Sequence, residues 1–175
     1  MSLEIIEKIR KKESLDLALE NALNKLKRAV KKRNDDLHLL NVVTVDDQSK
    51  PNTRNVVLRD FSIDNLTIRF HTDKRSSKIK DIKVNKSICL IGYDKKAKLQ
   101  IRIDADAYSI SDEETLLDIW KKMYPMSREC YRVSKSPGDR IESLNEVIFD
   151  KDDETNLIGF NNFAAIQCDI KTIEV

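Results

Sequence analysis

Residues 70–79, FHTDKRSSKI, carry the side-chain types of an anion-binding turn. The stretch opens with strand-like residues and closes like the start of a helix. Four groups able to hydrogen-bond to an anion lie between, namely Thr72, Ser76, Ser77 and Lys78. If a helix begins near Ser76, the free backbone N–H groups of its first turn and its dipole favour negative charge. A serine-capped helix with a solvated lysine is the alternative, and this stretch alone leaves it open.

A second stretch, RNVVLRD at 54–60, places two arginines in an otherwise apolar strand. Arg54 and Arg59 are five residues apart, so they point to opposite faces of a regular strand unless a bulge intervenes. An arginine among core residues needs a partner, and a phosphate fits guanidinium geometry best. Two surface arginines with acidic neighbours such as Asp60 are the alternative.

A third group is Gln100 in KLQIRI. A glutamine presents one acceptor and two donors, which match the imide edge of a flavin or a pyrimidine. A solvent-facing strand residue is the alternative reading of the same position.

The composition argues against several kinds of partner. The 175 residues include 32 basic and 30 acidic side chains, a net charge of +2, and aromatics make up only 6%. Nucleic-acid binders usually show a basic excess or a basic stripe with aromatics, so we expect no nucleic acid; an oligonucleotide-binding barrel is the weakest alternative. No apolar run approaches the roughly 20 residues that cross a bilayer, and the N-terminus is a poor secretory signal. We therefore expect no membrane partner and a cytoplasmic protein.

The cysteines indicate no metal site. Cys89, Cys130 and Cys168 are widely separated and distant in sequence from His38 and His71. That spacing suits neither zinc nor a disulfide framework, so we expect reduced, mostly buried thiols.

The elements that position these groups follow from periodicity. Apolar residues at 15, 19, 22, 23, 26, 29 and 30 predict an amphipathic helix with Ser14 as N-cap, in a helical segment over 1–33. From residue 37 the pattern becomes strand-like. Strands are predicted over 37–45, 54–61, 65–72, 87–94, 98–110 and 162–175, with helices over 76–84 and 111–123 and irregular loops over 131–160. The short hairpins indicate an antiparallel sheet that curls into a barrel over 37–175, which the last strand closes.

Taken together, three stretches resemble the pyridoxamine 5'-phosphate oxidase family of FMN proteins. They are RNVVLR at 54–59, FHTDKRSSK at 70–78 and LQIRIDADAYSIS at 99–111. The resemblance runs from about residue 37 to the C-terminus, and the leading helix is also typical. It implies a mainly β fold with flanking helices, namely an antiparallel FMN-binding split β-barrel with an N-terminal helix, as a single domain over 1–175. It also implies a homodimer with FMN at the interface.

The resemblance further implies a cofactor site. The residues that it carries over to FMN are Arg54, Asn55, Val56, Val57, Leu58, Arg59, His71, Thr72, Ser76, Ser77, Lys78 and Gln100. Arg54 and Lys78 would hold the phosphate with help from Ser77. Residues 55–58 would line the flavin with backbone and side-chain atoms, and Gln100 would bond the isoalloxazine ring.

On the substrate side the sequence departs from the family. Aligned on Pro125, the oxidases' Tyr, Arg, Ser series falls on Trp120, Tyr124 and Arg128, so it is not kept. The oxidases' distal tryptophan and Arg-x-His segment has no counterpart before Val175. Arg59, Arg128 and Arg132 remain as predicted substrate-binding residues, and no catalytic residue is identified.

The expected function is an FMN-dependent oxidoreductase that resembles pyridoxamine 5'-phosphate oxidase. It would oxidise an amine or related small substrate and pass the electrons to oxygen. The alternative is an FMN-binding carrier or sensor without that oxidase activity.

Overall fold

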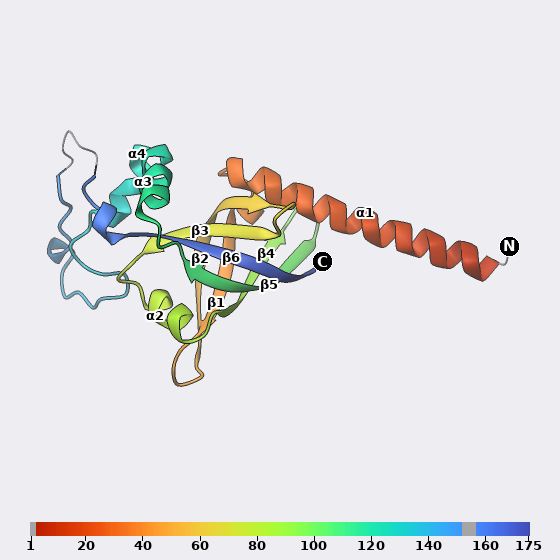
Figure 1. The fold of residues 1–175 in the computed structure, drawn as a ribbon, viewed down its shortest axis with the longest axis horizontal. Coiled ribbons are helices and arrows are strands. Elements are labelled where there is room, and N and C mark those ends of the chain that lie inside the picture. Colours follow the sequence, from red (N-terminus) through yellow and green to blue (C-terminus); the bar gives the residue numbers. More distant parts are fainter. Residues whose placement is uncertain (1–2, 152–156) are drawn as a thin grey trace.

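The structure is a computed structural model that describes residues 3–151 and 157–175 (Figure 1). Six strands form a closed antiparallel barrel in the order β1-β2-β3-β6-β5-β4. They are β1 (Leu39–Val45), β2 (Pro51–Ser62), β3 (Thr67–Asp73), β4 (Ser87–Asp94), β5 (Leu99–Ser109) and β6 (Phe163–Glu174). The helices are α1 (Leu3–Lys31), α2 (Ser77–Val84), α3 (Glu113–Lys122) and α4 (Pro125–Arg128), with 3-10 turns η1 (Asp36–His38), η2 (Glu129–Tyr131), η3 (Leu144–Glu146) and η4 (Phe160–Asn162). The predicted mainly β barrel with an N-terminal helix is confirmed.

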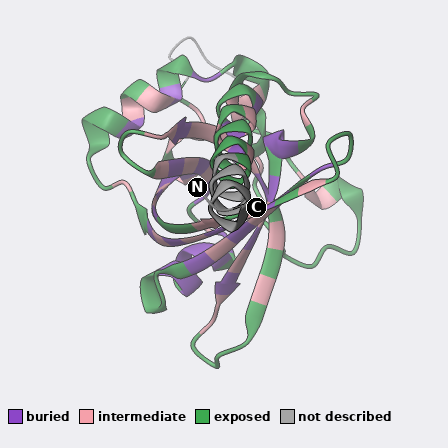
Figure 2. Cartoon of the chain, turned by 90° about the vertical axis from the view of Figure 1, so that its right-hand side faces the viewer, coloured by how far each residue is buried: buried purple, intermediate pink, exposed green. Residues whose placement is uncertain are grey.

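Alternation along the strands builds the barrel interior. In β5 the side chains of Ile101, Ile103, Ala105 and Ala107 are buried, whereas the polar residues between them face outward, as the sequence predicts. Figure 2 shows the same alternation of buried and more exposed residues on neighbouring strands. One continuous core results, in which Leu58, Phe70 and Ile166 are almost fully buried.

Helix α1 covers the barrel with only part of its length. Ala22, Leu26 and Ala29 are buried in the barrel core, whereas Leu15 and Leu19 of the same apolar stripe are 63% and 40% exposed. Figure 1 shows the N-terminal half of α1 projecting beyond the barrel. Within the described chain, no helix has the length and hydropathy that a membrane span requires.

The prediction that Ser14 caps this helix is wrong. Helix α1 begins at Leu3 and continues through Ser14 without a break. The preceding residues, IIEKIRKKE, are themselves mostly good helix formers, so the helix extends toward the N-terminus past a residue that would otherwise suit a cap.

A second, smaller core lies outside the barrel. Phe163 and Ala165 of β6 point away from the barrel interior and pack against Leu116 and Trp120 of α3. Tyr131 and Phe160 complete an aromatic cluster around Trp120, which is 0% exposed. Outside its short turns, the described part of 131–160 is irregular, as expected; residues 152–156 of that predicted loop region lie outside the described residues.

The three cysteines are free thiols in different surroundings. Cys168 is buried, Cys89 is half-buried and Cys130 is exposed. The expectation of mostly buried thiols is therefore wrong for Cys130, because it lies on the exposed side of the η2 turn, whose Tyr131 is the residue that enters the core.

Candidate functional site

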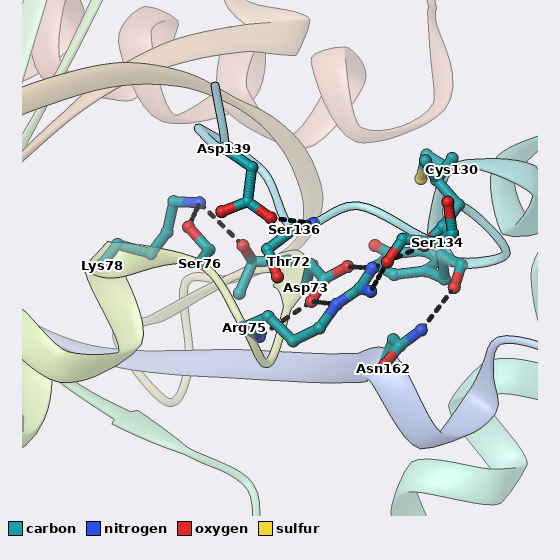
Figure 3. A network of polar contacts seen from close by, with 12 residues as sticks. Thr72, Asp73, Arg75, Ser76, Lys78, Cys130, Ser134, Ser136, Asp139 and Asn162 are labelled. Atoms are coloured by element: carbon teal, nitrogen blue, oxygen red, sulfur yellow. Dashed lines mark hydrogen bonds and ion pairs between the residues drawn. The ribbon is translucent and has the colours of Figure 1, made fainter. Parts of the chain in front are cut away.

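Strands β2 and β3 and the start of α2 bring four predicted residues together at one end of the barrel. They are Arg54, Thr72, Ser76 and Lys78, which we call the anion cradle. Lys78 Nζ donates hydrogen bonds to Thr72 Oγ1 at 2.8 Å and to Ser76 Oγ at 2.7 Å. Figure 3 shows these three side chains converging beside the turn that joins β3 to α2. The cation and its two hydroxyl neighbours come from residues that the sequence analysis singled out.

Arg54, the fourth cradle residue, lies near the start of β2. Its Nη1 donates to Thr44 Oγ1 at 2.5 Å, and its Nη2 lies 3.3 Å from Asp81 Oδ2. Thr44 and Asp81 are both buried, and Thr44 Oγ1 donates a hydrogen bond to Asp81 Oδ2. Sequence reasoning missed both. Thr44 is a polar residue in the mostly apolar strand LLNVVTV, whereas Asp81 is one of several charged residues in SKIKDIKV and is distinguished only by its burial beside Ile82.

Lys78 is a buried cation, so the solvated-lysine alternative is wrong. Its residue is 8% exposed, and burial, followed by the nearby Arg54 cation, lowers the pKa of Lys78 to about 8. Asp73 and Asp81 act in the opposite direction on the same pKa. No described carboxylate lies within ion-pair distance of Lys78 Nζ. A bound phosphate group would supply the negative charge that Lys78 lacks.

The first turn of α2 lies beside this lysine. Ser76 is the N-cap residue, yet its side chain makes no capping bond, because its hydroxyl accepts from Lys78 instead. Ser77, the first residue of α2, is exposed. The turn therefore keeps backbone donors that no serine side chain caps, an arrangement that suits an anion.

The predicted residues 55–58 divide between two faces of β2. Val56 and Leu58 are 6% and 1% exposed and belong to the barrel core. Because their side chains fill the core, these two residues can offer only backbone atoms to a ligand, and their role in FMN binding stays a prediction. Asn55 and Val57 point outward and stay available to a ligand.

Gln100 shares that outward face at a distance from the cradle. Asn55 pairs with Asn41 of β1, Asn41 with Ile91 of β4, and Ile91 with Arg102 of β5. Gln100 lies two residues before Arg102 on the same face, is exposed, and pairs with Tyr93. The barrel thus places Asn55 and Gln100 on one continuous outer surface, and no described contact joins Gln100 to the cradle itself.

Arg59 and His71 lie on the outer side of β2 and β3. A register shift between Leu58 and Asp60 marks a β-bulge beside Arg59, and the two arginines still lie on opposite faces of β2, as the spacing predicts. Neither ring nitrogen of His71 has a hydrogen-bond partner among the described residues. Burial, and then Arg59 and Arg69, lower the pKa of His71 to about 3. The imidazole is neutral at physiological pH, and so low a pKa makes it a weak general base.

The described contacts of the other two predicted substrate residues, Arg128 and Arg132, are with residues outside the cradle. Arg128 donates to Met123 O at 2.9 Å and lies over the Trp120 ring. Arg132 donates to Asp150 O through Nε at 2.8 Å. These contacts hold the segment between α3 and β6 in place, and a substrate role for Arg128 and Arg132 stays a prediction.

A separate cleft of about 720 Å³ lies at the other end of β1 from the cradle. The end of α1, the η1 region and the turn between β4 and β5 line it. Two of its carboxylates are engaged, Asp94 by Lys25 and Asp35 by Arg28. None of the predicted site residues lies in this cleft.

Comparisons with known proteins identify the family of this chain. A family model described as pyridoxamine 5'-phosphate oxidase, FMN-binding domain, matches residues 19–111. This span contains all of the anion cradle and Gln100. A search of curated proteins found no match.

Solved structures share the fold. A pyridoxamine 5'-phosphate oxidase-related FMN-binding protein from Nostoc punctiforme is 22% identical with a TM-score of 0.70, over 89% of this chain and 80% of that one. PhzG from Burkholderia lata, in complex with tetrahydrophenazine-1-carboxylic acid, is 16% identical with a TM-score of 0.60, over 99% and 79%. General Stress Protein 26 from Bacillus anthracis is 16% identical with a TM-score of 0.51, over 87% and 91%. At these identities the likeness concerns the fold, whereas the family model covers more than half of the chain. The chain therefore belongs to the family of the pyridoxamine 5'-phosphate oxidase FMN-binding domain.

Proposed function

We propose that this chain binds FMN and is a flavin-dependent oxidoreductase of small amines or related substrates, with oxygen as the final electron acceptor. The observation that carries the proposal is the anion cradle. Lys78 is buried between two hydroxyls with no described carboxylate in ion-pair distance, and Arg54 lies close enough to lower its pKa. A phosphate monoester such as that of FMN matches this charge and donor set.

The roles of the residues follow from their positions. The cradle would bind the phosphate, while Asn55, Val57 and Gln100 would face the flavin ring from the outer surface of the barrel. Arg59 would lie next to the substrate. Bound FMN would supply the hydride-accepting chemistry, and the protein's contribution would be binding, orientation and hydrogen bonding.

The test is a visible absorption spectrum of the FMN-loaded protein, kept anaerobic, before and after addition of pyridoxamine 5'-phosphate. We expect the flavin band to bleach and to return when oxygen is admitted. Free FMN at the same concentration is the control. A bound flavin that stays oxidised would contradict the oxidase assignment for this substrate while leaving FMN binding intact.

A second candidate function is FMN carriage or sensing without amine oxidation. It is favoured by the contacts of Arg128 and Arg132, whose guanidinium groups donate to backbone carbonyls within their own segment. Arginines held in this way are less available to a substrate phosphate. This candidate predicts tight FMN binding and no bleaching in the same experiment.

We also propose that the chain is a homodimer with FMN at the interface. The outer surface that carries Asn55 and Gln100 also exposes Leu39 and Tyr93, which are 53% and 49% exposed. A second copy could cover these apolar groups and supply the other wall for a planar ring. Light scattering that showed a monomer with FMN bound would contradict the proposal.

FMN affinity should depend on pH through Lys78, whose pKa is lowered to about 8. Below pH 8 the ammonium is present and attracts the phosphate. Above pH 8 binding must first restore the proton, so the dissociation constant should rise, by up to about tenfold per pH unit. Fluorescence titration of FMN from pH 6.5 to 9.5 checks this. The Lys78→Met variant should bind more weakly at pH 7 and lose the rise above pH 8; a rise of equal size in that variant would contradict the assignment to Lys78.

A further inference from the structure

Arg75 lies on the turn between β3 and α2, and it is bound tightly to Asp73 on the same turn. Arg75 Nε lies 3.0 Å from Asp73 Oδ1, and Nη2 lies 2.7 Å from Asp73 Oδ2. The backbone N–H of Arg75 also donates to Asp73 Oδ1 at 2.8 Å. Asp73 is only 5% exposed, so the pair is fixed by a buried carboxylate with two-pronged geometry.

The same guanidinium reaches a segment almost sixty residues away in sequence. Arg75 Nη2 donates to Val133 O at 2.9 Å, and Nη1 donates to Ser134 O at 3.1 Å. Figure 3 shows Arg75 lying between Asp73 and Ser134. One side chain therefore holds both the turn and residues 131–139, which we call the clasped loop.

A second link joins the same two parts of the chain. Asn162 Nδ2 donates to Tyr131 O at 2.9 Å, and Lys74 N donates to Asn162 O at 2.7 Å. Further along the clasped loop, Ser136 N donates to Asp139 Oδ2 at 2.9 Å. In the view of Figure 3 this pair is drawn near Thr72, Ser76 and Lys78. The first half of the loop thus lies against the cradle turn, and Asp139 is close enough to Arg75 to help raise the pKa of its guanidinium.

The turn that Arg75 holds is also the turn that shapes the cradle. Asp73 directly follows Thr72, and its carbonyl accepts from the backbone N–H of Ser76 at 3.1 Å. A change in the conformation of this turn therefore moves the cradle hydroxyls and the anchor of the loop together.

We propose that Arg75 is a positioning residue that couples occupancy of the anion cradle by a phosphate monoester to the order of the clasped loop. The proposal rests on the FMN-binding function proposed above. A phosphate that fixes the turn also fixes the loop through Arg75, and by reciprocity an ordered loop strengthens phosphate binding. The clasped loop includes Arg132, so one of the predicted substrate residues becomes ordered once the cofactor is in place.

The test measures hydrogen exchange of residues 131–139 with and without FMN, in wild type, Arg75→Ala and Arg75→Lys. In wild type we expect FMN to slow exchange of the loop. In Arg75→Ala we expect loop exchange about tenfold faster without FMN, little change when FMN is added, and FMN dissociation about tenfold faster, which corresponds to one lost charge-assisted contact.

Arg75→Lys separates positioning from folding. A lysine can neutralise Asp73 and preserve the fold, but one ammonium cannot hold both Asp73 oxygens and two carbonyls. We expect its thermal midpoint to stay close to wild type while the FMN effect on the loop is lost. Arg28→Lys is the matched control, because Arg28 pairs with Asp35 at the far end of β1 and should leave the FMN effect unchanged.

The possible outcomes distinguish a failure of the coupling from a failure of the proposed FMN-binding function. FMN binding with loop protection that persists in both Arg75 variants overturns the coupling alone. Absence of FMN binding by the wild type overturns the proposed function, and the coupling with it. Loss of the FMN effect in Arg75→Lys, with the Arg28→Lys control unchanged, supports the coupling.

Discussion

The Arg54→Glu protein is expected to bind FMN at least about 100-fold more weakly than the wild type. The substitution removes guanidinium donors from the cradle, each charge-assisted bond being worth roughly 1.5–3 kcal/mol. It also places a second carboxylate beside Asp81, which lies 3.3 Å from Arg54 Nη2. Quenching of FMN fluorescence during titration with protein measures the change.

A control with the same charge change separates the cradle from bulk electrostatics. Arg33→Glu alters an exposed arginine that lines the cleft at the other end of β1, and its FMN affinity should stay within about twofold of wild type because salt screens distant surface charges. Circular dichroism establishes that both variants are folded. Equal affinity of folded Arg54→Glu and wild type would mean that the phosphate binds elsewhere.

The Trp120→Ala protein should lose about 3–5 kcal/mol of unfolding free energy, the usual range for truncation of a buried aromatic side chain. Trp120 is 0% exposed and contacts the rings of Tyr131, Phe160 and Phe163. Its removal leaves a cavity in the core between α3 and β6. Urea unfolding followed by far-ultraviolet circular dichroism measures the loss, since Trp120 is the only tryptophan and its fluorescence disappears with it.

Tyr124→Ala is the matched control for this aromatic position. Tyr124 lies in the same segment, four residues on, but is 76% exposed. Its truncation should change the unfolding free energy by no more than about 0.5 kcal/mol. A similar small change in Trp120→Ala would show that the second core, between α3 and β6, contributes little to stability and that the barrel unfolds independently of it.

The strands could be predicted because every second side chain of a barrel strand faces the core, so apolar and polar residues alternate along its sequence. In β5 the alternation from Gln100 to Ala107 marks the buried face directly, and β4 shows the same alternation in burial. The cradle was predictable in part for a different reason. Thr72, Ser76 and Lys78 are neighbours in sequence, so a strand end followed by a helix start brings them together whatever the rest of the chain does.

Other features depend on contacts between distant residues, which a single sequence does not reveal. Asp81 meets Arg54 across 27 residues, and Arg75 meets Val133 across 58. The division of residues 55–58 between two faces also escaped prediction, because a motif transferred by resemblance does not say which side chains fill the core. The helical segment over 1–33 was predicted, but the cap at Ser14 was wrong, since helix-forming residues on both sides of Ser14 outweigh its preference for a cap.

The position of β6 has a consequence for the synthesis of this protein. Of the six strands, β6 leaves the ribosome last, yet it lies between β3 and β5 and pairs with both. Until then the other five strands can form only an open sheet, whose two free edges, β3 and β5, are open to pairing with other chains. One edge ends at Asp73, directly before the cradle turn, and pairs there with Phe163. A nascent chain would therefore complete the proposed FMN site only as the barrel closes, so early exposure to FMN should not protect it from aggregation.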